Sequence, residues 1–197
     1  MAKGLFITVE GIDGCGKSTQ AGLIAAALEA AGHDVLRMRE PGGAKISEKI
    51  REILLDPANG EMGDVCELLL YEAARAQLVH EVITPALAAG RTVVCDRFYD
   101  STTAYQAFAD GLDPEIVAEA NTIAVDGYHP DLTFVFDVPV EEASRRRSGR
   151  AAEDRLELKG LAFQEKVAAG FRAIAAEDPA RVKLVDAARS IEAIFKD

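Results

Sequence analysis

The sequence predicts an α/β protein in which a five-stranded parallel sheet carries helices on both faces. Short apolar segments rich in β-forming residues alternate with longer segments whose apolar residues recur with a helical period. A glycine-rich loop stands between the first such strand and the first helix. Strands that alternate with helices pair in parallel, because each connection crosses back over the sheet. The expected strands cover about residues 5–9, 34–39, 92–95, 132–137 and 182–185.

Local signals set the helix boundaries. Asp113 and Pro114 begin one helix, because aspartate caps a helix and proline suits its first position. Pro85 lies near the end of a long helical pattern, where it should kink or end the helix. The expected helices cover about residues 17–31, 46–55, 62–89, 113–126, 140–147 and 156–176, and a short helix closes the chain.

Length, charge and cysteine content limit the class of protein. The 197 residues suffice for one well-packed domain but not for two full ones, so we expect a single domain over residues 1–197. The net charge of −11 argues against binding to nucleic acid or to an acidic membrane, since both require basic surfaces. Cys15, Cys66 and Cys95 have no C-x-x-C spacing, and no segment resembles a signal peptide or a membrane span. These features favour a reduced, cytoplasmic protein.

Residues 11–18 fit the phosphate-loop pattern G-x-x-x-x-G-K-[ST] at every fixed position. Glycines let successive backbone N–H groups face an anion, and the following helix N-terminus adds positive potential. In such a loop Lys17 reaches the β and γ phosphates of a nucleoside triphosphate, and the Ser18 hydroxyl ligates Mg²⁺. The residues expected to hold the triphosphate are Gly11, Ile12, Asp13, Gly14, Cys15, Gly16, Lys17, Ser18 and Thr19.

Further polar residues follow the other expected strands. Ligands of open parallel sheets bind at the carboxyl ends of the strands, and Gly11, Glu40, Asp96 and Asp137 all fall there. This placement predicts one site along that edge of the sheet. The phosphate loop alone does not choose among kinases, ATPases and GTPase switches, so residues elsewhere have to decide.

Four segments resemble the thymidylate kinase family, and the resemblance runs from about residue 5 to residue 186. They are Glu-Gly-Ile-Asp-Gly at 10–14, Arg-Glu-Pro-Gly-Gly at 39–43, the string from Asp96 to Gln106, and Pro-Asp-Leu-Thr at 130–133. The resemblance implies a P-loop NTPase fold of the nucleoside monophosphate kinase type. It also implies phosphoryl transfer from ATP to dTMP, which gives dTDP and ADP for dTTP synthesis, on a homodimer that uses Mg²⁺.

The resemblance assigns roles to individual residues. Asp13 matches the carboxylate that approaches the deoxyribose 3′-hydroxyl, and Arg97 matches the arginine that grips the acceptor phosphate. Tyr71 and Arg75, which share one helix face, match the ring that stacks on thymine and the arginine that binds its carbonyl oxygen. Tyr105 matches a tyrosine that crowds the sugar 2′ position. The implied catalytic residues are Asp13, Lys17, Arg97 and Arg150, the Mg²⁺ ligands are Ser18 and Asp96, and the dTMP-binding residues are Asp13, Glu40, Arg51, Tyr71, Arg75, Arg97, Thr102, Tyr105 and Gln106.

The segment of about residues 145–156 holds the densest run of arginines and resembles the lid of the family. One type within the family carries a catalytic arginine in the phosphate loop and another carries it in the lid. The variable loop positions here contain no arginine, so the sequence resembles the bacterial type with the catalytic arginine in the lid. Alignment on residues 154–156 places Arg150 at that position, with Arg155 a second candidate for it, and the resemblance implies that both arginines bind ATP.

Two related functions are the alternatives. A kinase for another nucleoside monophosphate, or for a deoxynucleoside, would keep the loop and the lid but would lack the Tyr71 and Arg75 pair and the residues from Ser101 to Gln106. A GTP-binding switch would need an N-K-x-D motif after a strand, and the sequence has none. A motor or transporter ATPase would need coupling domains, for which this chain has no room.

Overall fold

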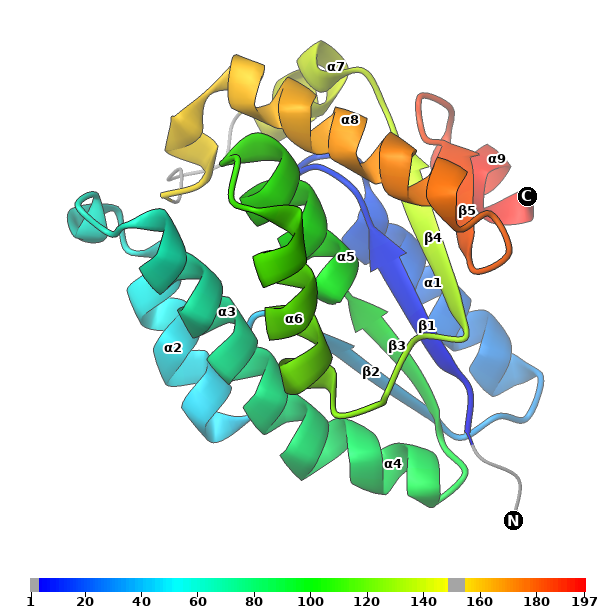
Figure 1. Ribbon diagram of the computed structural model, residues 1–197. Coiled ribbons are helices and arrows are strands. Elements are labelled where there is room, and N and C mark those ends of the chain that lie inside the picture. The colour runs from blue at the N-terminus through cyan, green and yellow to red at the C-terminus, as the bar shows by residue number, and fades with distance from the viewer. Residues whose placement is uncertain (1–3, 149–154) are drawn as a thin grey trace.

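The computed structural model of the protein describes residues 4–148 and 155–197. In these residues five strands form one parallel sheet with the order β2-β3-β1-β4-β5, and the predicted α/β fold is confirmed (Figure 1). All five strands lie where the sequence predicts them. They are β1 (Phe6–Glu10), β2 (Val35–Arg39), β3 (Thr92–Asp96), β4 (Leu132–Asp137) and β5 (Val182–Asp186).

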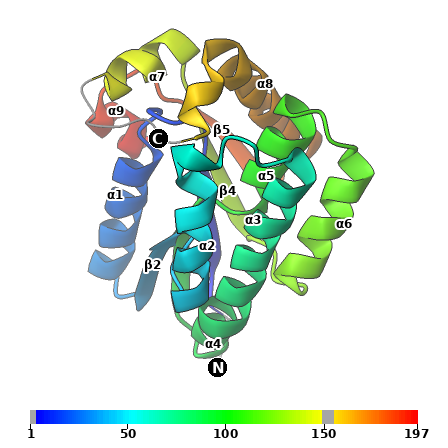
Figure 2. The same ribbon diagram turned by 90° about the vertical axis from the view of Figure 1, so that its left-hand side faces the viewer.

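Helices cover both faces of the sheet. The described residues contain α1 (Lys17–Ala30), α2 (Lys45–Leu55), α3 (Asp64–Leu78), α4 (Thr84–Ala88), α5 (Tyr99–Thr102), α6 (Pro114–Val125), α7 (Val140–Arg147), α8 (Leu161–Glu177) and α9 (Ile191–Lys196). Figure 2 shows α1 and α9 on one side of the sheet and α3, α6 and α8 on the other. No helix in the described part of the chain is long and apolar enough to cross a membrane.

Strand side chains fill one layer of core on each side of the sheet. Phe6 of β1 stands opposite Val93 of β3, and both pack with apolar residues of α3 and α4. Val9 and Val94 point to the other side, where their cluster includes Ala21 of α1. The central strands are therefore buried on both faces, as their continuous apolar runs predict.

The long helix predicted over residues 62–89 is divided. It consists of α3, a π-helical turn over Val79–Ile83, and α4, with Pro85 in the first turn of α4. A proline inside a regular α-helix removes one hydrogen bond and its ring clashes with the preceding turn. The wider π turn lies directly before Pro85 and accommodates the kink that the proline predicts.

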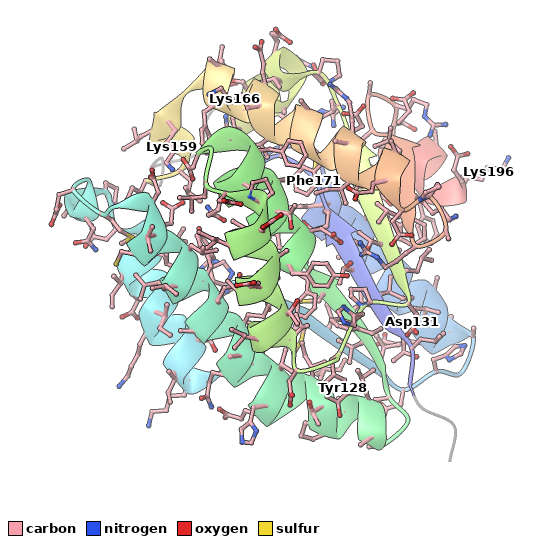
Figure 3. The ribbon with its side chains drawn as sticks, viewed as in Figure 1. Tyr128, Asp131, Lys159, Lys166, Phe171 and Lys196 are labelled. Carbon is pink, nitrogen blue, oxygen red and sulfur yellow. The ribbon has the colours of Figure 1, made fainter. Side chains whose placement is uncertain are left out.

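Residues 99–109 are helical, which the sequence does not predict. The short helix α5 continues into a π-helical segment over Thr103–Ala109. This segment packs on α8 at Gly170, where a Cβ atom would lie 2.9 Å from the Cβ of Phe108. Contact with α8 therefore stabilises a helical form in residues whose own preference for helix is weak. Phe171, which follows Gly170, points from α8 into the interior (Figure 3).

Candidate active site

The phosphate loop joins β1 to α1, and its three glycines, Gly11, Gly14 and Gly16, adopt conformations that other residues rarely adopt. Gly11 has φ 136°, and a Cβ there would lie 2.7 Å from the carbonyl oxygen of Phe136. Gly14 has φ 90°, and its Cβ would lie 2.3 Å from the carbonyl oxygen of Ala143. The loop is thus pressed against the end of β4 and against α7, and only glycine fits at these positions. Its backbone ends at the N-terminus of α1, which favours an anion.

Asp13 lies between two cations at the centre of the loop. Its Oδ1 accepts hydrogen bonds from Lys17 Nζ at 3.1 Å and from Arg97 Nη2 at 2.6 Å. Burial opposes ionisation of Asp13, but the charges of Arg97 and Lys17 outweigh it and hold the pKa of this carboxyl well below its usual range. The carboxylate is therefore charged at neutral pH and fixes both cations in the site.

Arg97 follows β3 in a left-handed backbone conformation, with φ 72°. Its Nη1 donates to the carbonyl oxygen of Gly11 at 3.1 Å and to Ser101 Oγ at 3.0 Å. Its guanidinium also lies over the ring of Tyr105, 5.1 Å from the ring centre. A non-glycine residue adopts positive φ only when its surroundings enforce it, and such residues cluster at functional sites.

Glu10 enforces the shape of the loop that carries Arg97. Its two carboxylate oxygens accept from the Phe98 backbone N–H at 2.7 Å and from Ser101 Oγ at 2.6 Å. Burial, together with the nearby charge of Asp100, raises the pKa of Glu10 to about 8. In the sequence Glu10 stands out only as part of a family motif. The structure shows that it anchors the loop that carries Arg97, through contacts with residues about ninety positions away in the chain.

The raised pKa of Glu10 predicts a dependence of stability on pH. The unfolded chain releases this proton near 4.5 and the folded chain near 8, so the free energy of unfolding should fall between these values. The slope from one group is at most about 1.4 kcal/mol per pH unit. Because the pKa of Glu40 is also raised, to about 7, Glu40 contributes part of the decline below pH 7. Glu10→Gln should therefore make the decline from pH 5 to 8 smaller and remove most of it between pH 7 and 8, in urea unfolding measured at pH 5, 7 and 8.

Glu48→Gln is the matched control for this experiment. Glu48 is partly exposed, and its hydrogen bond from the Gly43 backbone N–H lowers its pKa, so its contribution changes only below pH 5. The Glu48 variant should keep the wild-type slope between pH 5 and 8. An equal slope in the wild type and in the Glu10 variant would show that Glu10 does not hold its proton in the folded state.

Ser18 and Asp96 bring two oxygen ligands together at the start of α1. Ser18 Oγ donates to Asp96 Oδ2, while Asp96 Oδ1 is buried and has no hydrogen-bond partner among the described residues. Mg²⁺ in phosphate-binding sites takes one or two protein oxygens and completes its shell with phosphate and water oxygens. The two side chains fit such an ion. Elsewhere in the described residues no group of three or more His, Cys, Asp or Glu side chains could hold a metal.

A cavity, here called the Arg75 cavity, extends from the phosphate loop to α2, α3 and the π-helical segment. Every residue that the sequence predicts around dTMP lines it, and so do Lys17, Ser18 and Asp96. The predicted dTMP-binding residues in its wall are Asp13, Glu40, Arg51, Tyr71, Arg75, Arg97, Thr102, Tyr105 and Gln106. The structure thus brings together residues from positions 13 to 106, while their binding roles stay a prediction.

Arg75 is fixed in the wall of this cavity by surrounding acceptors. It is buried, and its Nε and Nη2 bind Glu40 Oε2 at 2.9 and 2.8 Å. Its Nη1 binds Thr102 Oγ1 at 2.9 Å and also contacts Glu72. Burial raises the pKa of Glu40 to about 7, although the charge of Arg75 acts against this rise. These contacts hold the guanidinium in one orientation.

A second cavity, here called the Arg189 cavity, lies on the other side of the phosphate loop. The loop residues from Asp13 to Gln20 line it together with Arg146 of α7, Arg189 and residues 190, 191 and 194 at the C-terminal end of the chain. Arg146 is held there by the carbonyl oxygen of Ala187 at 3.0 Å. The sequence offers no signal for Arg189, and the arginine run at 145–147 by itself indicates only a solvated helix face.

Two predicted positions, Arg155 and Asp137, do not line these cavities. Arg155 is buried, binds the carboxylate of Glu67 and donates to the carbonyl oxygen of Leu54 at 2.9 Å. Arg155 is not among the residues that line either cavity, and its binding of ATP stays a prediction. Asp137, at the end of β4, is bound by Arg172 at 2.8 Å. Arg150 lies outside the described residues.

A parallel sheet whose first strand leads through a phosphate loop into a helix, with two cavities meeting at that loop, defines a P-loop NTPase-type fold. The sequence model of the thymidylate kinase family matches residues 9–197, so the chain belongs to this family. The thymidylate kinase of Trichlorobacter lovleyi is 49% identical over 189 residues, which cover 93% of this chain and 89% of that protein.

Two further comparisons agree. The thymidylate kinase of Exiguobacterium sibiricum is 47% identical over 191 residues, covering 97% of this chain and 90% of that protein. The crystal structure of thymidylate kinase from Ehrlichia chaffeensis matches with a TM-score of 0.77 and 34% identity, covering 93% of each chain. Both likenesses extend over nearly the whole chain.

Proposed function

We propose that the protein transfers the γ-phosphoryl group of ATP to dTMP, giving dTDP and ADP for dTTP synthesis. The observation that carries the proposal is the junction of the two cavities. Asp13, Lys17 and Ser18 line both the Arg75 cavity and the Arg189 cavity. A donor phosphate in one cavity and an acceptor phosphate in the other therefore meet at these side chains, as direct transfer in line requires.

The residues at the junction have separate tasks in this proposal. Lys17 neutralises charge on the β and γ phosphates, and Arg97 grips the acceptor phosphate through its planar fork. Asp13 orients both cations and reaches the 3′-hydroxyl of the deoxyribose. Ser18 and Asp96 would hold Mg²⁺, which would supply positive charge against the phosphate oxygens. Arg150, in the segment outside the described residues, is proposed to add a further cation.

The two nucleosides occupy opposite ends of the site in this proposal. Thymine stacks on Tyr71 and is bound by Arg75, with Thr102 and Gln106 beside it, and Tyr105 crowds the sugar. Arg51, which donates to the carbonyl oxygen of Pro41 at 3.0 Å, lines the same end. The adenosine of ATP lies in the Arg189 cavity, where Arg146 and Arg189 offer cationic planes for its ring.

A panel of acceptors tests the proposal. With ATP and Mg²⁺, an assay coupled to ADP release should give the highest kcat/KM for dTMP, with far lower values for AMP, CMP and GMP. Uracil lacks one methyl group, which an apolar pocket distinguishes by roughly 10-fold to 200-fold, so dUMP should be a poor substrate. A higher kcat/KM for CMP or AMP would identify a different monophosphate kinase, and turnover of thymidine would identify a deoxynucleoside kinase.

The protein is further proposed to work in the cytoplasm as a homodimer. Its three cysteines, Cys15, Cys66 and Cys95, are free thiols, as in a reducing compartment.

The proposed dimer is supported by large apolar side chains that are exposed on neighbouring helices, among them Leu69 on α3 and Ile123 on α6. Such surfaces mark protein contacts. Sedimentation at micromolar concentration should give the dimer mass, and Leu69→Asp should give the monomer mass.

A further inference from the structure

Glu67 lies behind the Arg75 cavity and makes contacts that the proposed reaction does not use. It belongs to α3 and is 1% exposed. Its Oε1 accepts a hydrogen bond from Gln106 Nε2 at 2.7 Å, and its other oxygen binds Arg155. Lys159 Nζ approaches Oε1 at 3.5 Å, from the turn that precedes α8 (Figure 3). Glu67 is therefore a buried carboxylate held between two cations and one amide.

This arrangement fixes which way the amide of Gln106 points. A carboxylate in an ion pair accepts hydrogen bonds and donates none, so the amide nitrogen of Gln106 has to face Glu67. The carbonyl oxygen, bonded to the same carbon, then points away from Glu67 at an angle and stays open to another partner. Gln106 lines the Arg75 cavity, and no group in residues 4–148 or 155–197 donates to its Oε1. The amide oxygen of Gln106 is therefore available to accept a hydrogen bond from a ligand in the Arg75 cavity.

A hydrogen-bond acceptor in the same cavity as the donor Arg75 matches one type of pyrimidine edge. Thymine and uracil present a carbonyl oxygen at position 4 beside an N–H donor at position 3. Cytosine presents an amino donor at position 4 beside an acceptor nitrogen at position 3. Arg75 donates and Gln106 Oε1 accepts, so this pair complements thymine and opposes cytosine at both positions. A buried site that leaves such groups mismatched rejects the wrong ligand strongly.

We propose that Glu67 is a positioning residue that makes the site select N3–H pyrimidines, because it sets the orientation of the Gln106 amide. The proposal rests on the proposed function, since it concerns the choice of acceptor base. Glu67 touches no substrate and acts only through Gln106. Arg155 and Lys159 support it in turn, because they hold the carboxylate in place from the far side.

Glu67→Gln tests the proposal by replacing a pure acceptor with an amide. The oxygen of the new amide should turn to Arg155, whose charge makes the stronger bond, so its nitrogen faces Gln106. Gln106 then has to reverse its own amide and present a donor to the cavity. The ratio of kcat/KM for dTMP to that for dCMP should fall at least about tenfold. The ratio for dTMP to dUMP should stay unchanged, because both bases carry the same edge.

Three further variants make the test selective. Glu67→Asp keeps the charge for Arg155 but moves the carboxylate away from Gln106, so the dTMP to dCMP ratio should fall by a smaller factor. The swapped double variant, Glu67→Gln with Gln106→Glu, restores an acceptor toward the cavity and should return the ratio to the wild-type order. Asp110→Asn removes a second partner of Lys159, bound at 2.7 Å, without touching the amide, and should leave the ratio unchanged.

Each outcome supports or rejects the role of Glu67. Equal losses of activity toward dTMP and dCMP in Glu67→Gln, with no recovery in the double variant, would make Glu67 a structural residue only. Should Glu67→Gln fail to fold, Glu67→Asp decides, and an unchanged ratio there overturns the proposal. A wild-type protein that does not prefer dTMP rejects the proposed function instead. The two failures are therefore distinguishable.

Discussion

Lys17→Ala is expected to lower kcat by at least about a thousandfold while leaving the fold intact. The lysine amine lies at the junction of the two cavities, 3.1 Å from Asp13, and charge develops there between the β and γ phosphates during transfer. Lys17 is not an apolar residue of either core cluster, so its loss leaves those clusters complete. Steady-state ADP release measures the loss, and circular dichroism with thermal unfolding checks the fold.

Lys166→Ala is the matched control for Lys17→Ala. Lys166 lies on α8, is exposed and points to solvent (Figure 3), so its removal changes the same net charge without altering the site. Its variant should retain the wild-type kcat. Near-normal turnover in Lys17→Ala would show that the phosphate loop does not bind the donor phosphates, and the proposed assignment of the two cavities would fail with it.

The strands and the phosphate loop could be predicted because their signals are local. The run from Leu5 to Val9 is apolar on both faces of the sheet, and the loop pattern occupies eight consecutive residues. The helical form of residues 99–109 could not be predicted in this way. It depends on a close approach to Gly170, more than sixty residues further along the chain, and such tertiary contacts override local preference.

Some residues of the candidate site could likewise be predicted from local sequence signals, and others could not. Arg97 and Asp13 lie in segments that resemble a known family, so the sequence could propose them and the structure places them 2.6 Å apart. Glu67 and Arg189 lie in no such segment. Glu67 acquires its contacts from Gln106 and Arg155, which are 39 and 88 residues away. The ion pair of Arg155 with Glu67 likewise joins residues far apart in the sequence, so no local signal indicates it.

Arg97→Ala is expected to lower kcat/KM for dTMP by at least about a thousandfold, because it removes a planar cation from the acceptor phosphate. Asp13 pairs with both Lys17 and Arg97, and the variant leaves it with Lys17. Lys17 should then be drawn more firmly to Asp13 and less to the donor phosphates. The loss of the cation at the acceptor phosphate and the firmer pairing of Lys17 with Asp13 should both slow phosphoryl transfer. Kinetics with dTMP varied at saturating ATP measure the loss.

Arg97→Lys separates the charge of Arg97 from its shape. Lysine keeps the positive charge but cannot bind Gly11, Ser101 and a phosphate oxygen pair at once, as the fork of arginine can. We expect it to recover at most about a tenth of the lost kcat/KM. Arg172→Ala, which removes an exposed arginine from Asp137, is the control and should keep wild-type kinetics. Full activity in Arg97→Lys would mean that charge alone suffices, and the proposed grip on the acceptor phosphate would then be wrong.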